Sequence, residues 1–174
     1  MGLGYNFIKD MKIKVRAIEN LDNLQMKEII TSSLAKLDIL GEGCTSEDNE
    51  LNDLSSSFSG DDSKYCVVVD EERDEVLGGG GFARLKGTSD NEGICEFQKF
   101  YFTEKIQGKG LGKKLLSCLV DRAKKAGYKI AYLETHHKME KAIKLYEKHG
   151  FKYLEKPMGN TGHHQRSFCM CKCL

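Results

Sequence analysis

Residues 96–116 contain a strand, a glycine-rich turn and the start of a helix in direct succession, and they constrain the fold more than any other part of the 174-residue chain. Aromatic residues favour a strand in the first part, where the even-numbered residues from Glu96 to Phe102 would share one face at a period of two. From Leu111 onwards, apolar residues recur at helical spacing. Three glycines at alternate positions form the junction. The stretch therefore predicts a strand–turn–helix unit.

The junction has the chemistry of an anion site. The first N–H groups of a helix have no partner within the helix, and the aligned peptide dipoles make this end positive. Gly108, Gly110 and Gly112 lack the side chains that would keep a phosphate away from these N–H groups. Lys109 and Lys113 add positive charge at the same place. We therefore expect the turn to bind an anion, and a diphosphate fits best.

Three interpretations of this junction compete. A flexible turn before an ordinary helix needs no ligand, because isolated glycine motifs are weak signals. A P-loop requires glycine in place of Gln107 and a hydroxyl residue in place of Lys114. A Rossmann fingerprint fails at its third glycine, where Lys113 stands, although Glu134 lies near the place of the ribose-binding acid of that fold. The third interpretation is a resemblance to a known family.

Two motifs resemble the signatures of the GCN5-related N-acetyltransferases. The motif Gln107-x-x-Gly110-x-Gly112 is similar to the Gln/Arg-x-x-Gly-x-Gly/Ala motif of that family, which also follows a strand and opens a helix. Residues 142–151, which carry Leu-Tyr and end in Gly-Phe, resemble the second signature. The resemblance covers residues 12–155, and a softer match to the tail of some members extends over residues 159–163.

The resemblance implies an α/β fold, in which a central and mostly antiparallel sheet is splayed at its fourth and fifth strands and flanked by about four helices. The residues favour the same class, because strands dominate the first half of the chain and a strand–helix–strand–helix series follows. The length predicts a single domain over residues 1–174, with residues 1–11 as a flexible segment.

The resemblance further implies that acetyl-CoA binds as a co-substrate in the gap of the splayed sheet. The backbone of the central strand would bond the pantetheine arm, and the turn would hold the pyrophosphate; no metal is implied. The implied cofactor-binding residues are Phe100, Tyr101, Phe102, Gln107, Gly108, Lys109, Gly110, Leu111, Gly112 and Lys113.

Tyr146 matches the usual proton donor of the family, a phenol beside the sulfur of CoA. The alternative is a core tyrosine, because Tyr146 shares a helical face with Met139, Ala142 and Ile143. Met139 also stands where many members carry an asparagine, so that one side-chain contact to the cofactor is missing or comes from elsewhere.

Glu96 occupies the place of a general-base glutamate in some members. We expect it on the strand face that carries Gln98 and Phe100, where apolar neighbours would raise its pKa. The structural alternative is an ion pair with Lys99 or Arg84. Rival bases are His136 and His137 after the next strand and, on the softer match alone, His163 and His164.

The function implied is transfer of the acetyl group of acetyl-CoA to a primary amine of a small molecule or peptide, by direct attack in a ternary complex. Two alternatives stay open: a non-catalytic acyl-CoA-binding or sensing domain, and a nucleotide-binding module. The net charge of +1 gives no reason to expect nucleic acid or membrane as a partner.

The seven cysteines show no Cys-x-x-Cys spacing, so we expect reduced, buried thiols rather than a zinc site. The sequence has no signal peptide or bilayer-length apolar run, and we expect a cytoplasmic protein.

Four other segments carry predictions. Residues 21–40 predict a helix ended by Gly41-Glu42-Gly43, with Leu24 on its apolar face. The acidic residues between Glu47 and Asp62 would attract an amine cation or form a solvated loop. Gly78–Gly81 mark a bulge or a close approach within a strand. The cysteine-rich strand 167–173 would be a sheet edge, on which a homodimer could form.

Overall fold

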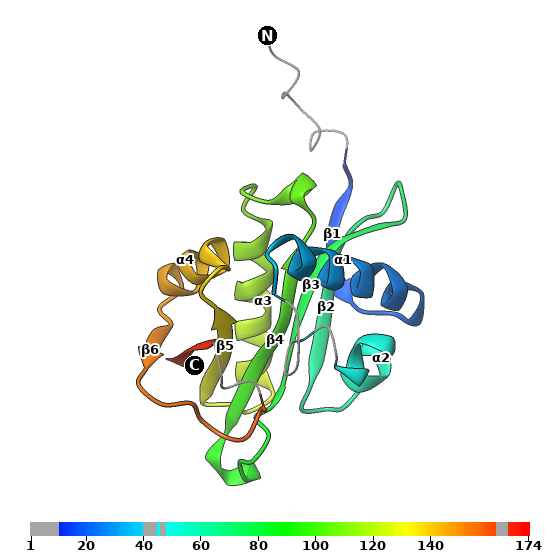
Figure 1. The fold of residues 1–174 in the computed structure, drawn as a ribbon. Coiled ribbons are helices and arrows are strands. Elements are labelled where there is room, and N and C mark those ends of the chain that lie inside the picture. The colour runs from blue at the N-terminus through cyan, green and yellow to red at the C-terminus, as the bar shows by residue number, and fades with distance from the viewer. Residues whose placement is uncertain (1–10, 40–44, 46–47, 163–166) are drawn as a thin grey trace.

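The computed structural model describes residues 11–39, 45, 48–162 and 167–174, which form one seven-stranded sheet with helices on both faces (Figure 1). The sheet order is β1-β2-β3-β4-β5-β7-β6. The strands are β1 (Ile13–Ala17), β2 (Lys64–Asp70), β3 (Glu75–Arg84), β4 (Ile94–Phe102), β5 (Ile130–His136), β6 (Lys152–Leu154) and β7 (Ser167–Cys173). The helices are α1 (Asn23–Lys36), α2 (Leu54–Ser57), α3 (Leu111–Lys125) and α4 (Glu140–Lys148), with 3₁₀ turns η1 (Asn20–Asp22), η3 (Asn49–Asn52), η4 (Asp90–Glu92) and η5 (Glu104–Ile106). The predicted fold class is confirmed.

The sheet is splayed between its two central strands. Every neighbouring pair is antiparallel except β4 and β5, which run parallel. Their pairing joins Ile94–Glu96 to Ile130–Tyr132 and goes no further. The later part of β4, residues 97–102, is therefore not paired with β5, which is the gap that the resemblance implied.

Alternating side chains supply a separate core for each face of the sheet. Cys66 and Val68 of β2 pack with Leu115 and Leu119 of α3, whereas Tyr65 and Val67 pack under α1 and α2. A third and smaller cluster lies on the same face as the second, over the start of β4 and over β5 and β7. It contains Leu85, Ile94, Tyr132 and Cys169.

A bulge at Lys99 breaks the alternation along β4. Lys99 has a φ of +53°, and the register with β3 shifts opposite it, between Gly79 and Gly81. Phe97 and Phe100 consequently belong to the same core cluster, on the α3 face. The prediction that the even-numbered residues from Glu96 to Phe102 share one face is therefore wrong beyond the bulge, because one extra residue turns the later side chains over.

The glycine run of β3 gives room to aromatic rings of the neighbouring strands. A Cβ placed on Gly80 would lie 2.5 Å from Cδ2 of Phe100, and one on Gly78 would lie 2.4 Å from Cδ1 of Phe102. Gly79 and Gly81 face the ring of Tyr65 of β2 in the same way, at 2.7 and 2.6 Å. The run thus marks both a bulge and a close approach, as predicted, and neighbouring strands make the approach.

Helix α1 is shorter than predicted, and its buried face agrees with the prediction only in part. It ends at Lys36; Ile29 and Leu34 are buried as predicted, whereas Leu24 is 67% exposed and Met26 and Ile30 are buried instead. Residues 41–43, the predicted helix end, lie outside the described residues, as do residues 1–10. In the described part of the chain, no helix has the length and apolar character needed to cross a membrane.

The C-terminal strand is not an edge of the sheet. β7 lies between β5 and β6 and pairs with both. The edge prediction is therefore wrong, and with it the stated basis for a homodimer. Cysteines of the described residues are free thiols, and burial raises the pKa of Cys66 to about 11 and of Cys95 to about 12. Cys44 lies outside the described residues.

Candidate active site

The start of α3 is bare main chain, as the sequence predicts. Gly108 and Gly110 have φ angles of +75° and +80°, a region that L-residues with side chains rarely occupy. A Cβ on either would meet no atom within 4 Å, so the space in front of the turn is open. Gly110 is the N-cap of α3, and no side chain caps the helix there. The first N–H groups of α3 therefore face open space.

Gly112 has a different reason to be glycine. A Cβ there would lie 3.3 Å from Leu145 of α4 and 3.7 Å from Phe102 of β4. The missing side chain lets the first turn of α3 approach the end of β4 and helix α4 closely. The turn, the strand and α4 thus meet at one place, where both family-like motifs of the sequence lie.

Polar and basic side chains surround this turn. The side-chain amide of Gln107 donates to the carbonyl of Phe102 at 3.3 Å, and its oxygen accepts from Lys141 at 2.9 Å. Lys109 and Lys113 are exposed. These contacts fix the exit from β4 and leave a positive, solvent-facing rim.

Tyr146 lies beside the end of β4. Its ring centroid is 6.0 Å from that of Phe100 and 5.8 Å from that of Phe151. Burial, and secondarily Tyr101, raises the pKa of Tyr146 above its ordinary range. The hydroxyl therefore stays protonated at neutral pH. Tyr146 thus lies in the core, which is what the interpretation as a core tyrosine predicts. It also lies next to the part of β4 that does not pair with β5, which is what the interpretation as a proton donor requires.

Glu96 is the last residue of β4 that pairs with β5, and its partner there is Tyr132. It is 7% exposed, and Gln98 donates to it at 2.7 Å. Because of the bulge, Glu96 and Gln98 face the opposite side of the sheet from Phe100 and Tyr146. In the described part of the chain, Arg84 pairs with Asp90, and Lys99 with acidic residues of another segment, so the predicted ion pair of Glu96 with either is wrong.

The histidines after β5 form a small pair. The rings of His136 and His137 have centroids 4.2 Å apart, and His136 Nδ1 accepts from the N–H of Lys138 at 3.2 Å. Thr135 before them is buried, and its hydroxyl has no hydrogen-bond partner among the described residues. His163 and His164 lie outside the described residues.

The acidic residues between Glu47 and Asp62 were predicted to attract an amine cation or to form a solvated loop, but those that the structure describes have a structural role. Lys99 extends from the bulge with its side chain 4% exposed, and it binds Asp48 at 2.9 Å and Glu50 at 3.0 Å. Burial would raise the pKa of Glu50, but the charge of Lys99 lowers it below its ordinary value. Asp53 accepts from the N–H of Ser56 and caps α2. These carboxylates hold η3 and α2 against the sheet; Glu47 lies outside the described residues.

A second carboxylate, Glu134, lies on the same sheet face as Glu96 and was not predicted as a site residue. It accepts from the hydroxyl of Tyr132 and from that of Thr161, each at 2.7 Å. One sequence signal could have indicated this residue: Tyr132 and Glu134 are two positions apart on the strand beside the central one, so their side chains share a face. Thr161 comes from the loop after β6, and no sequence pattern links it to β5.

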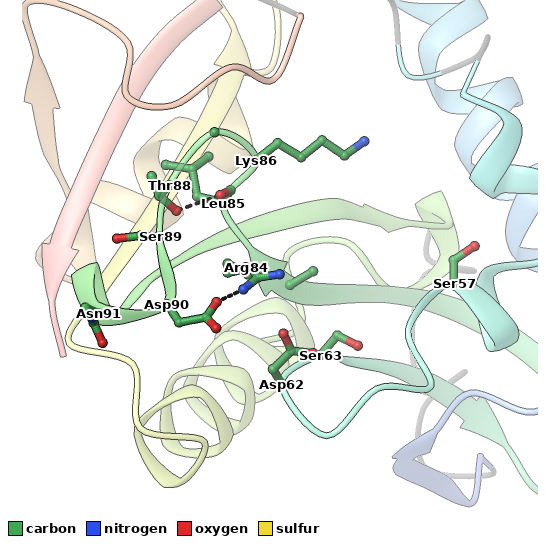
Figure 2. A pocket seen from close by; sticks show the side chains of 12 residues that line it. Ser57, Asp62, Ser63, Arg84, Leu85, Lys86, Thr88, Ser89, Asp90 and Asn91 are labelled. Atoms are coloured by element: carbon green, nitrogen blue, oxygen red, sulfur yellow. Dashed lines mark hydrogen bonds and ion pairs between the residues drawn. The ribbon is translucent and has the colours of Figure 1, made fainter.

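A cavity of about 820 Å³ opens on this face, between α2 and the β3–β4 hairpin (Figure 2). Its lining includes Ala83, the register partner of Glu96. Arg84 and Asp90 meet in an ion pair within it (Figure 2). Lys86, from the hairpin, reaches Glu50 at 3.3 Å. Neither Glu96 nor Tyr146 is among the described residues that line the cavity. Among the described residues, no group of His, Cys, Asp and Glu could hold a metal ion.

The sheet with its gap, the bare start of α3 and the tyrosine of α4 define the acyl-CoA N-acyltransferase class of fold. The family model described as "Acetyltransferase (GNAT) family" matches residues 29–151, and the chain belongs to this family of acetyltransferases.

Known relatives agree with this assignment. The uncharacterized N-acetyltransferase YjgM of Escherichia coli K12 is 38% identical over 150 residues, which are 86% of this chain and 87% of that one. A GNAT acetyltransferase of Staphylococcus aureus Mu50 superposes with a TM-score of 0.79 at 16% identity, covering 92% of this chain and 98% of that chain. A putative acetyltransferase of Salmonella typhimurium, yncA, solved with acetyl-CoA, superposes with a TM-score of 0.71 at 21% identity, covering 93% and 94%.

Proposed function

We propose that this acetyltransferase moves the acetyl group of acetyl-CoA to a primary amine of a small molecule or peptide, in a complex that contains both substrates. One observation supports this most: the open main chain of Gly108 and Gly110 lies directly beyond the part of β4 that β5 leaves unpaired. The first feature suits a pyrophosphate, and the second suits the amides of a pantetheine arm.

The residues fit acetyl-CoA on grounds of shape and charge. The turn from Gln107 to Lys113 offers N–H groups, open space and exposed lysines for the pyrophosphate. Phe100–Phe102 offer main chain on the side of β4 that does not pair with β5, where the carbonyl of Phe102 accepts from Gln107. The thioester would then lie at the level of Tyr146, because the ring of Tyr146 packs on Phe100.

In the proposed reaction, the amine nitrogen forms a bond to the acetyl carbon and the carbon–sulfur bond breaks. Tyr146 gives its hydroxyl proton to the departing sulfur; its raised pKa means that the hydroxyl carries this proton at neutral pH and that the transfer has to be coupled to the breaking of the carbon–sulfur bond. Glu96, directly or through a water molecule, takes the proton that the amine loses. The two residues face opposite sides of the sheet, so the donor and the base would act from the two sides of the gap.

Thermal melting tests the cofactor part. Acetyl-CoA and CoA at a hundredfold excess over their dissociation constants should stabilise the protein by about 2.7 kcal/mol, whereas ATP and NAD should not. Because the thiols could react with a thiol reporter, melting should precede any thiol-release assay. A shift with ATP or NAD alone would contradict the proposal. A shift with acetyl-CoA but no acetylation of any amine would favour an acyl-CoA-binding domain.

The identity of the base is testable by exchanging its candidates. Glu96→Gln should lower kcat/KM about 10²–10⁴-fold at neutral pH, because the amide cannot take a proton. His136→Asn and His137→Asn are the matched exchanges at the rival positions and should leave most activity. A loss confined to a histidine variant would move the role of base to that residue.

A further inference from the structure

The loop that follows β6 crosses the sheet face on which Glu96 lies. We call its described part, residues 155–162, the strap. The N–H of Asn160 donates to the carbonyl of Lys86 in the β3–β4 hairpin at 2.7 Å. The very next residue, Thr161, donates to Glu134 of β5. The strap therefore passes from the hairpin to β5 within one residue, over the place where β4 and β5 separate (Figure 1).

Close packing fixes the strap on the side of the hairpin. Gly159 has a φ of +66°, and a Cβ there would lie 2.4 Å from the carbonyl oxygen of Lys86. Gly87 faces it, with a Cβ position 3.0 Å from the nitrogen of Asn160. Two glycines with positive φ thus let the two main chains touch. Beneath them, Met158 packs on the small cluster that contains Leu85, Ile94 and Tyr132.

Hydrogen bonds to Glu134 fix the strap on the side of β5. Oε1 of Glu134 accepts from both Tyr132 and Thr161. The fully buried hydroxyl of Tyr132 also accepts from the N–H of Met158 at 3.4 Å. Burial and these contacts raise the pKa of Tyr132, so it stays a donor. Glu134 is two residues beyond the last β4–β5 pair, and it thus anchors the strap where the gap opens.

We propose that Glu134 is a positioning residue for the amine acceptor: through Thr161 it holds the strap over the gap, and the strap forms the wall of the acceptor site next to Glu96. This inference rests on the proposed acetyl transfer to an amine. The strap and the α1–α2 segment cover the same sheet face from two sides, with Glu96 and Gln98 of β4 between them. An acceptor that reaches Glu96 from this face must pass along the strap.

The test compares Thr161→Val, which keeps the shape and removes the donor, with Thr161→Ser, which keeps the donor. The acceptor is whichever of spermidine, L-lysine, kanamycin and a lysine-containing peptide the wild type acetylates fastest. Loss of a hydrogen bond to a charged group predicts that Thr161→Val raises the KM for this amine about tenfold, while kcat and the KM for acetyl-CoA stay within about twofold. Thr161→Ser should restore the wild-type KM.

Two further variants separate this role from general destabilisation. Thr31→Val is the matched control, since among the described residues the hydroxyl of Thr31 bonds only to carbonyls of its own helix. It should change no kinetic constant. Glu134→Ala should raise the KM for the amine as well, and the two exchanges together should raise it by less than the product of their separate effects. Hydrogen exchange should show faster exchange of the Asn160 amide in Thr161→Val, with α3 unchanged.

Each outcome decides the matter. If Thr161→Val loosens the strap but leaves the amine KM unchanged, the strap is not the acceptor wall and this inference fails alone. If Thr161→Val unfolds the protein, Gly159→Ala repeats the test from the hairpin side, and an unchanged amine KM there also overturns the inference. If the wild type binds acetyl-CoA but acetylates none of the amines, the proposed function fails and this inference with it.

Discussion

The two ends of β4 carry the two halves of the candidate active site, and they are built from different parts of the chain. At the Phe102 end the site consists of main chain: a part of β4 that does not pair with β5, and a turn whose glycines face open space. At the Glu96 end, side chains from distant segments meet, among them Lys99 with Asp48 and Glu50, and Glu134 with Thr161. A local motif specifies the first half, whereas only the folded chain assembles the second.

Tyr146 lies beside the Phe102 end of β4, where it packs on Phe100, and its exchange should have the largest effect. Tyr146→Phe should lower kcat about 10²–10⁴-fold, because the ring stays and the proton donor is lost. The stabilisation by acetyl-CoA should not change, since the main-chain half is intact. Steady-state kinetics and thermal melting of the same preparation measure both. Unchanged turnover would show that the departing sulfur finds its proton elsewhere.

Lys99 tests the side-chain half. Lys99→Met leaves Asp48 and Glu50 without their buried cation, and it should lower the free energy of unfolding by about 1–3 kcal/mol. The lower end applies if water reaches the carboxylates, which are 23% and 34% exposed. Lys36→Met is the matched control at an exposed pair with Glu104 and should cost about 0–1 kcal/mol. Denaturant unfolding measures both, and equal losses would contradict the special role of the buried lysine.

Gly110 tests the main-chain half. Gly110→Val places a side chain at positive φ, which costs about 1–2 kcal/mol, and fills the open space in front of α3. Gly127 is a matched control at the other end of α3, because it has a φ of +90° and equally open surroundings. Both variants should melt earlier by similar amounts, but only Gly110→Val should weaken acetyl-CoA binding, by about tenfold or more. Equal affinities in calorimetry would exclude the turn as the pyrophosphate site.

Acid should weaken the side-chain half through Glu50, with the smallest effect of the four changes. The lowered pKa of Glu50 means that the unfolded chain binds this proton more readily than the folded one. The stabilisation is therefore complete above the ordinary pKa of 4.5 and is lost as the pH falls through the lower folded value. Glu50→Gln should flatten the acid limb of a plot of unfolding free energy against pH. An identical acid limb in the variant would show that the pair with Lys99 adds no stability.

The same contrast explains what the sequence could predict. The strand–turn–helix unit and the second signature are contiguous, so their elements were predicted correctly, and the resemblance that they carry implied the gap between β4 and β5. The glycine run of β3 predicted a bulge or a close approach, but not that β4 carries the extra residue, because a lysine at positive φ has no local signature. The partners of Lys99 lie about fifty positions away in the sequence, at Asp48 and Glu50, and no periodicity connects such residues.

The position of β7 illustrates a second limit. Its alternating pattern predicts a strand, and a strand is found, but the pattern does not say which neighbours it has. β6 is only three residues long, Lys152–Leu154, and it still takes the edge from β7. The sequence predicts a strand at residues 151–154 but does not say which strand it pairs with, so the order of the last two strands depends on tertiary contacts.

The glycine run of β3 restricts how this protein can change over time. Phe100, Phe102 and Tyr65 rest on main chain, which has no rotamers with which to fill a void if a ring becomes smaller. Conversely, a methyl group on Gly80 has no room unless the ring of Phe100 shrinks. Substitution on either strand alone is therefore unfavourable, and the aromatic residues and the glycines opposite them should change together or not at all.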